Sequence, residues 1–257
     1  MATPTCEQDN QMTISSKSRN KRTAFGRGTG MVAIATLISS LLMLGCGKGS
    51  SDGGNKAAAG KAKSASALDA LKSASTTEEK VSALGKLKDV SGSASKEVGA
   101  QAVEMLKDGE AEVRTAALDL IGMIKYNDPT AVTALTGLFK DDEDEEVKKR
   151  ALVTLKDIGA ADDHVKLAME ALAGGDEDMQ DYAIFQLSEA GEAAEPALAQ
   201  LEAALDSKNY YTRMYAAMAL GNLGSKAASA KAKLEALTTD KETDVAAAAK
   251  EALGKIE

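Results

Sequence analysis

Tryptophan is absent from the 257-residue sequence, and phenylalanine and tyrosine together supply only 3% of it. Proline occurs three times. A core so poor in rings argues against a β-sandwich or barrel, because strands favour aromatic and β-branched side chains. Long stretches of Ala, Leu, Glu and Lys, which have high helix propensity, predict an all-α fold instead.

Cysteine and histidine are equally scarce. Cys6 and Cys46 both precede the predicted helical region, so neither a disulfide framework nor a CxxC metal site is available. His164 is the single histidine and stands in "ADDHVK" at a predicted helix start, where Asp162 and Asp163 favour capping over a metal site. No Ser or Cys has the acid-placed histidine that a nucleophilic triad needs. The sequence predicts no enzyme, no cofactor, no metal and no small-molecule substrate.

Acidic residues outnumber basic ones only after the first 45 residues. That segment holds five of the 31 basic residues and two of the 39 acidic residues, so residues 46–257 carry 26 basic and 37 acidic residues, a net charge of −11. Such a field opposes nucleic acid, whose binding depends on basic contacts to phosphate. It is compatible with basic partners, although most acidic domains are acidic for solubility.

The chain has one long apolar run, "MVAIATLISSLLML" at residues 31–44. Fourteen residues are too few for a comfortable transmembrane helix, which needs about 20. The run follows the basic stretch "KSRNKRTAFGR" and ends at small residues, an order that predicts a secretory signal peptide over residues 1–45. A retained core helix is the alternative, and translation from Met12 also stays open.

The end of this run, "LMLGC", resembles the lipobox of bacterial lipoproteins, although Met43 stands where that family usually has Leu. The resemblance implies that Cys46 is lipidated and that residues 1–45 are removed. Gly47 rather than Asp after the cysteine implies an outer-membrane destination in a Gram-negative envelope. Residues 46–63 lack large apolar side chains and are expected to form a flexible tether to a domain at residues 64–257.

That domain is repetitive. Five segments align without gaps, with starts separated by 34, 32, 33 and 33 residues. They are "VRTAALDLIGMI" from Val113, "VKKRALVTLKDI" from Val147, "MQDYAIFQLSEA" from Met179, "TRMYAAMALGNL" from Thr212 and "VAAAAKEALGKI" from Val245. With the first residue of each segment as position 0, apolar side chains recur at positions 0, 4, 7, 8 and 11, the stripe of one helix. Position 4 is alanine in all five segments, which allows close helix approach.

Each of these helices follows a shorter amphipathic one, expected at residues 128–139, 163–172 and 195–205, and a degenerate earlier copy ends at Leu87. A single hairpin cannot bury its own stripe, so about six hairpins are expected to stack into one continuous core. The motif resembles HEAT repeats of the phycobilisome-lyase type, carried by Glu112-Val113-Arg114 with Ala117 and by Glu146-Val147-Lys148 with Ala151. The resemblance implies a right-handed α-solenoid whose basic position 1 (Arg114, Lys148, Arg213) pairs with an acid of a neighbouring turn.

Two surfaces are candidate sites. The turns before the second helices are acidic, and stacking would align them into an acidic ridge formed by Asp141, Asp142, Glu143, Asp144, Glu145 and Glu146. Helix capping is a sufficient explanation of these acids, and the EF-hand spacing is absent. Positions 2 and 6 point away from the stripe, and with position 3 at its edge they predict an apolar groove on the concave surface, formed by Val153, Tyr182, Phe185, Met214, Tyr215 and Met218. Packing between helices is the alternative explanation of these side chains.

The function expected from these features is a lipid-anchored scaffold or adaptor that binds a protein or peptide partner in the bacterial envelope. A structural envelope protein that uses its acidic ridge is the alternative. A bilin-lyase-like enzyme is less compatible, because an exported lipoprotein occupies the wrong compartment. HEAT-like hydroxylases need several His-Glu pairs, and HEAT-like DNA glycosylases need a basic surface. This sequence has neither.

Overall fold

The computed structural model describes residues 65–89, 93–174 and 176–256, which belong to a compact unit spanning Ser50–Glu257. The predicted signal peptide, Cys46 and the tether lie outside the described residues. Residues 65–73 are helical. The α-helices that follow are α2 (Thr77–Lys86), α3 (Ser93–Met105), α4 (Ala111–Met123), α5 (Pro129–Asp141), α6 (Glu145–Asp157), α7 (Ala161–Gly174), α8 (Glu177–Glu189), α9 (Leu198–Ala204), α10 (Tyr210–Leu223), α11 (Lys231–Leu237) and α12 (Thr243–Ile256), with 3-10 helices η1 (Gly191–Ala197) and η2 (Gly224–Ala230). Within the described ranges no strand occurs, and no helix is long and apolar enough to cross a membrane.

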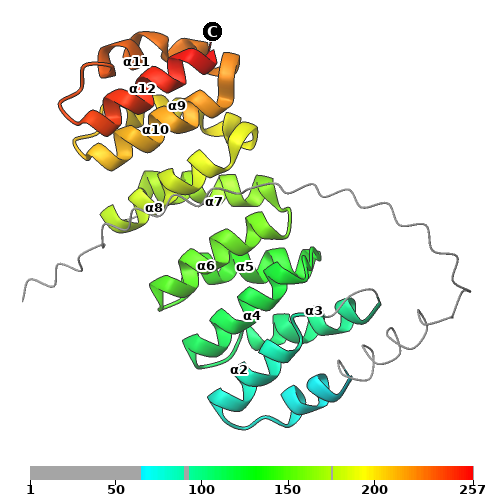
Figure 1. The fold of residues 1–257 in the computed structure, drawn as a ribbon. Coiled ribbons are helices and arrows are strands. Elements are labelled where there is room, and N and C mark those ends of the chain that lie inside the picture. The colour runs from blue at the N-terminus through cyan, green and yellow to red at the C-terminus, as the bar shows by residue number, and fades with distance from the viewer. Residues whose placement is uncertain (1–64, 90–92, 175, 257) are drawn as a thin grey trace, which may run out of the picture. The chain divides into compact units, whose positions relative to one another are not determined.

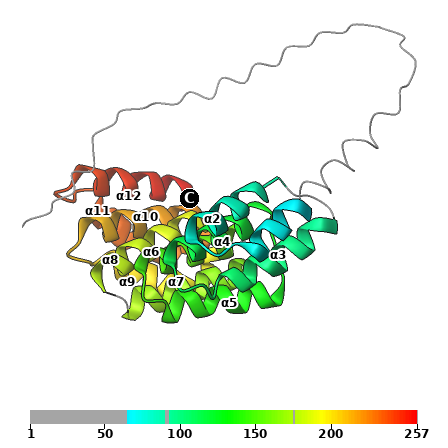
Figure 2. The same cartoon turned by 90° about the horizontal axis from the view of Figure 1, so that it is seen from below.

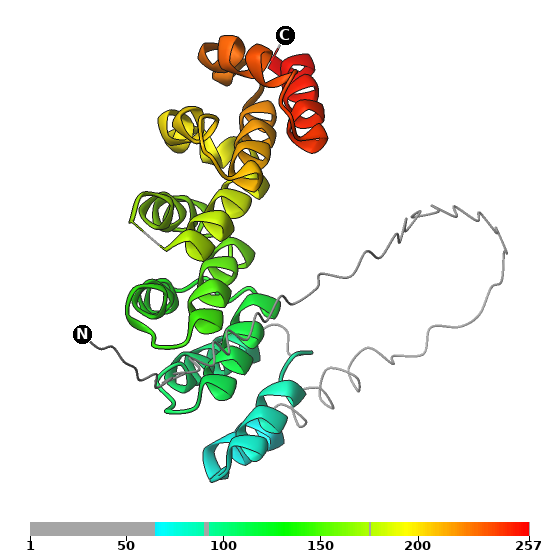
Figure 3. The same cartoon turned by 90° about the vertical axis from the view of Figure 1, so that its left-hand side faces the viewer.

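The helices form antiparallel pairs stacked in chain order, from cyan to red in Figures 1 and 3. We call α2, α4, α6, α8, α10 and α12 the second helices, and the helical segments that precede them the first helices. Consecutive second helices pack against one another in α2–α4–α6 and in α8–α10–α12, and α7 packs against both α6 and α8. On the other side, α5 and α7 lie side by side, as Figure 2 shows. The predicted all-α repeat solenoid is confirmed.

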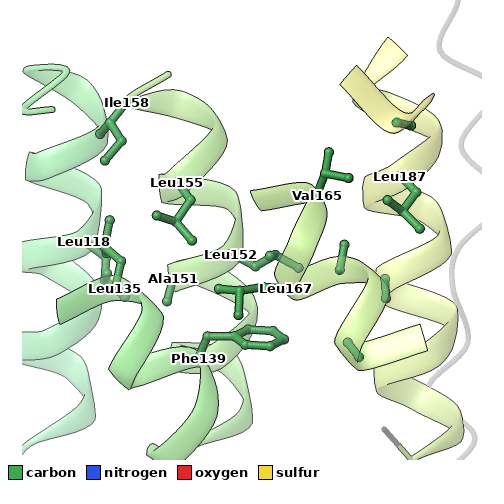
Figure 4. Close-up of a cluster of buried hydrophobic side chains, with 14 of the residues drawn as sticks. Leu118, Leu135, Phe139, Ala151, Leu152, Leu155, Ile158, Val165, Leu167 and Leu187 are labelled. Atoms are coloured by element: carbon green, nitrogen blue, oxygen red, sulfur yellow. The ribbon is translucent and has the colours of Figure 1, made fainter. Parts of the chain in front are cut away.

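The core follows the predicted stripe. The alanines at position 4 (Ala117, Ala151, Ala183, Ala216 and Ala249) are all fully buried. Figure 4 shows how Leu152 and Leu155 of α6 point between Leu118, Leu135 and Leu167 of neighbouring helices. Full burial of one such leucine stabilises the fold by about 1.5–3 kcal/mol, and it requires the next repeat to be present.

The tightest helix approach lies between α10 and α12. A Cβ atom placed on Gly221 would lie 2.8 Å from the Cα of Ala252 and 3.0 Å from its Cβ. Only glycine on α10 and alanine on α12 leave room for this spacing. Small residues therefore set the distance between these two helices.

Acidic side chains begin several helices, as the capping prediction requires. Asp144 accepts a hydrogen bond from the Val147 amide at the start of α6, and Asp176 accepts one from the Met179 amide at the start of α8. Asp128 caps α5, with Pro129 in the first turn. Each cap of this kind stabilises its helix by about 1 kcal/mol. The acids are thus partly explained by local helix chemistry.

The predicted pairing of position 1 with a neighbouring turn is confirmed in two repeats. The Arg114 guanidinium donates to both carboxylate oxygens of Asp142 at 2.8 and 2.7 Å, and Arg213 donates to both oxygens of Asp240 at 2.9 Å. Lys80 of α2 makes the equivalent contact with Asp108 at 2.6 Å. After Lys148 the equivalent acceptor position is Gly174, which offers no carboxylate.

In the last two helix pairs, the first helix differs from the prediction. One helix was expected over residues 195–205, but the chain forms η1 with Pro196 inside it and then the short α9. η2 and α11 repeat this bend without a proline, so Pro196 is not its cause. Both bends follow a glycine of positive φ, Gly191 at 58° and Gly224 at 57°. Each 3-10 helix buries an alanine pair, Ala194 with Ala197 and Ala227 with Ala230.

Candidate functional site

The six predicted groove residues lie on three consecutive second helices. Val153 is on α6, Tyr182 and Phe185 are on α8, and Met214, Tyr215 and Met218 are on α10. Five of them are half-buried, and 38% of Met218 is exposed. We call this surface the second-helix face. These side chains are therefore neither sealed in the core nor fully solvated.

The aromatic side chains of this face form a continuous row. The ring centroids of Tyr182 and Phe185 are 6.5 Å apart with planes tilted by 47°. Phe185 and Tyr215 are closer, at 5.3 Å, with a T-shaped angle of 68°. Edge-to-face pairs at such distances are attractive beyond the apolar area they bury. The row links α8 to α10.

A repeat register explains why these rings meet. Position 6 of one second helix lies next to position 3 of the following one, since Asp119 forms an ion pair with Arg150 at 3.2 Å from α4 to α6. Phe185 and Tyr215 occupy the same two positions in α8 and α10. This register brings charged side chains together between α4 and α6, and it brings aromatic side chains together between α8 and α10. Nothing in the single-helix periodicity reveals this offset.

Tyr182 is held by α6. Its hydroxyl donates to the Lys149 carbonyl at 3.4 Å, and the Lys149 ammonium lies 5.7 Å from the centre of its ring. Glu145 holds the same ammonium at 2.9 Å. Burial raises the pKa of Tyr182 to about 12. Lys149 was not predicted as a site residue, although aligning position 2 across the repeats would have placed it beside the face.

Tyr215 has a different environment. Burial raises its pKa, and the Tyr211 side chain and the carboxylates of Glu189 and Asp181 raise it further. Asp181 accepts hydrogen bonds from Asn209 at 2.7 Å and from the Thr212 hydroxyl at 2.9 Å. The Lys149 ammonium thus lies against the Tyr182 ring, whereas Asp181, the equivalent residue of α8, reaches the first turn of the helix that carries Tyr215.

Two further tyrosines begin α10. Tyr210 and Tyr211 stack with ring centroids 4.0 Å apart, and 47% of Tyr211 is exposed. A hydrogen bond with Tyr211 is the main cause that raises the pKa of Tyr210 to about 12. The aromatic side chains of α8 and α10 thus form one spatial cluster around these two helices.

The six residues of the acidic ridge have different environments. Asp142 is occupied by Arg114, and Asp144 caps α6. Glu145 pairs with Lys149. The side chains of Asp141, Glu143 and Glu146 are exposed. Among the described residues no group of three or more His, Cys, Asp or Glu side chains is placed to hold a metal ion.

His164 lies in the core rather than on the surface. Only 1% of it is exposed, and its Nε2 atom is 3.3 Å from the amide oxygen of Gln186. Burial lowers its pKa more than the Gln186 hydrogen bond raises it. This histidine is a satisfied structural side chain that joins α7 to α8.

Several hollows lie elsewhere on the solenoid. One of about 520 Å³ separates α7 from η1 and is lined by Val165, Met169 and Pro196. Another of about 480 Å³ lies between Phe139 and Met179, near the acidic turns. None of the six predicted groove residues lines either of them. The second-helix face is an open surface rather than a deep pocket.

The comparisons agree with the repeat architecture. A designed armadillo repeat protein in complex with the peptide (KR)4 is 22% identical, with a TM-score of 0.51 over 75% of this chain and 98% of that chain. An engineered protein is 23% identical, with a TM-score of 0.50 over 78% and 59% of the two chains. Human deoxyhypusine hydroxylase in complex with glycerol is 17% identical with a TM-score of 0.40, too distant to bear on chemistry. A comparison with curated proteins finds no match.

A family model supplies the assignment that these distant structures do not. The model of HEAT repeats matches residues 65–156, 99–180 and 165–254. The overlapping matches span most of the chain and coincide with the stacked helix pairs from the helix at residues 65–73 to α12. The chain belongs to the HEAT-repeat proteins.

Proposed function

We propose that this HEAT-repeat protein is a non-catalytic adaptor that holds a protein or peptide partner on its second-helix face. One observation carries the proposal: Tyr182, Phe185 and Tyr215 form a row across two helices, and the exposed Met218 lies about one turn after Tyr215 on α10. Aromatic and methionine side chains in partly exposed rows are typical of protein interfaces. Repeat solenoids of this class serve widely as protein-binding scaffolds.

The proposal assigns no reaction to the chain. Its one histidine is buried against Gln186, so it cannot act as a general base toward a ligand at the surface. The described carboxylates near the face make hydrogen bonds or ion pairs, or stand in solvent as single groups. The surface offers binding area instead of a concave, water-excluding reaction site.

The partner is expected at a bacterial envelope. The support is the sequence pattern at residues 1–63, with lipidation at Cys46 and a tether that keeps the solenoid near the membrane without spanning it. Mass spectrometry of the mature N-terminus tests this assignment, because a diacylglyceryl-modified Cys46 is expected as its first residue. Cys46→Ala should accumulate as an uncleaved precursor, and a processed, unlipidated chain would contradict the anchor.

Site-specific photocrosslinking tests the face itself. A photoreactive amino acid at position 218 of the full chain should crosslink one defined partner, whereas the same group at Ala236, exposed on α11, should not. Met218→Asp should abolish this crosslink from a second reporter at position 214. Met123→Asp is the matched control, because Met123 is 61% exposed on α4 and outside the aromatic row. Equal crosslinking from positions 218 and 236 would contradict the proposal.

A further inference from the structure

Lys149 and Tyr182 define a second register between the repeats. Lys149 is at position 2 of α6, and Tyr182 is at position 3 of α8. The ammonium lies 5.7 Å from the ring centre, within the range of a cation–π interaction. Glu145 keeps it there with an ion pair of 2.9 Å. Between α6 and α8 the protein thus places one of its own ammonium groups, that of Lys149, against the Tyr182 ring.

Between α8 and α10 the aromatic ring at position 3 recurs, but the lysine at position 2 does not. Tyr215 is the position-3 residue of α10, and the position-2 residue of α8 is Asp181. Asp181, Phe185 and Glu189 follow one another at four-residue spacing on α8, so both carboxylates lie on the side of the helix that carries Phe185. Within the described ranges no lysine or arginine lies over the ring of Phe185 or Tyr215. The same register therefore places an aspartate, which reaches Thr212 in the first turn of α10, where the preceding pair of helices has the lysine.

This arrangement is complementary to a guest cation. The Phe185–Tyr215 pair presents aromatic surface whose electron-rich faces attract cations, and Asp181 and Glu189, one helical turn on either side of Phe185, add charge of the opposite sign. Two hydrogen bonds hold the Asp181 carboxylate in place, and it retains lone pairs for another donor. Met218, exposed beside the pair, can cover an aliphatic stem.

We propose that the Phe185–Tyr215 pair, together with Asp181 and Glu189, binds a lysine or arginine side chain of an extended partner segment. This inference rests on the proposed adaptor function and names the chemistry of the partner. The net charge of −11 over residues 46–257 also attracts a basic segment and speeds its association. The face would thus select basic peptides by an aromatic and carboxylate site rather than by general charge alone.

The test uses the full chain and a fluorescent octapeptide of alternating lysine and arginine. A neutral octapeptide of acetyl-lysine and citrulline controls for charge. Fluorescence anisotropy should show binding of the charged peptide only. Tyr215→Leu should weaken it about two- to fivefold, the range of an exposed cation–π contact, whereas Tyr215→Phe should bind like the parent because it keeps the ring.

Matched variants separate the site from the general negative field. Glu189→Gln should weaken binding about two- to fivefold, but Glu235→Gln, which removes the same charge from α11, should leave it within about 1.5-fold. Lys149→Gln uncovers the Tyr182 ring and should tighten binding. Absent binding, or equal effects of Glu189→Gln and Glu235→Gln, would overturn the inference. If the peptide measurements fail in either way while the crosslink at position 218 persists, the adaptor function stands and this inference alone fails.

Discussion

Arg213 of α10 and Asp240 before α12 form a bidentate ion pair with two hydrogen bonds of 2.9 Å. Their side chains are only 8% and 9% exposed, and Arg213 also donates to the Ser207 carbonyl at 2.8 Å. The guanidinium hydrogen bond lowers the pKa of Asp240. The pair therefore connects the turns of consecutive repeats at a place where little of either side chain is exposed.

Asp240→Ala should destabilise the protein by about 3 kcal/mol, because it leaves the buried Arg213 charge without its partner. Urea unfolding followed by circular dichroism measures this loss. Asp206→Asn is the control, since the exposed Asp206–Lys233 pair should contribute less than about 1 kcal/mol. Similar losses in the two variants would show that the Arg213–Asp240 pair has no special weight.

Gly221→Ala should destabilise the protein by about 1–3 kcal/mol, although alanine is the better helix former. The added Cβ would lie 2.8 Å from the Ala252 backbone and would push α10 away from α12. Gly137→Ala in α5 has no atom within 4 Å of the new Cβ and should stabilise by about 0.5–1 kcal/mol. Thermal unfolding compares them, and a stabilised Gly221→Ala would contradict this helix spacing.

Lys125→Gly should stabilise the protein by about 1 kcal/mol. Lys125 has a φ of 51°, a conformation that costs a residue with a side chain, and the equivalent residues of later repeats are Gly159, Gly191 and Gly224. Gly159→Lys is the reciprocal variant and should destabilise by a similar amount. Chemical denaturation of both variants checks the pair, and shifts of the same sign would refute the conformational explanation.

Stability should fall as the pH drops below about 6.5, the ordinary pKa of an unfolded histidine. Burial lowers the native pKa of His164, so the unfolded chain binds this proton more readily and protonation favours unfolding. Lys156 lowers the pKa further, and Asp157 opposes it. Because His164 is the only histidine, one imidazole NMR signal reports its titration. Between pH 7.5 and 5.5 the free energy of unfolding should fall less in His164→Gln than in the parent protein. An equal fall in the two proteins would exclude His164 as the cause.

Charge reversal separates the structural and binding roles of the acidic ridge. A triple variant with Asp141→Lys, Glu143→Lys and Glu146→Lys should keep its helix content, because these three side chains are exposed to solvent. Asp142→Lys should reduce stability because it removes the ion pair with Arg114, and Asp144→Lys should reduce it because it removes the N-terminal cap of α6. If the exposed triple variant also lost the position-218 crosslink, the acidic ridge would be part of the binding surface.

Much of the fold could be predicted because helix periodicity is a local property. The spacing of apolar residues placed the second helices and their buried alanines, and Asp144 and Asp176 marked helix starts by their capping chemistry. The six face residues were placed on the outward side for the same reason. The bend of η1 and α9 was missed, because no local signal separates it from a straight amphipathic helix.

Only the tertiary structure decided which side chains meet across repeats. Periodicity gives the direction in which Lys149, Asp181 and Tyr215 point, but not the offset between neighbouring helices. That offset depends on side-chain volume at the contacts, as Gly221 against Ala252 shows. The sequence by itself determined a repeating all-α chain and the composition of its faces. Packing decided that the Tyr182 ring receives the Lys149 ammonium and that Asp181, at the equivalent position of α8, reaches Asn209 and Thr212 of the next repeat.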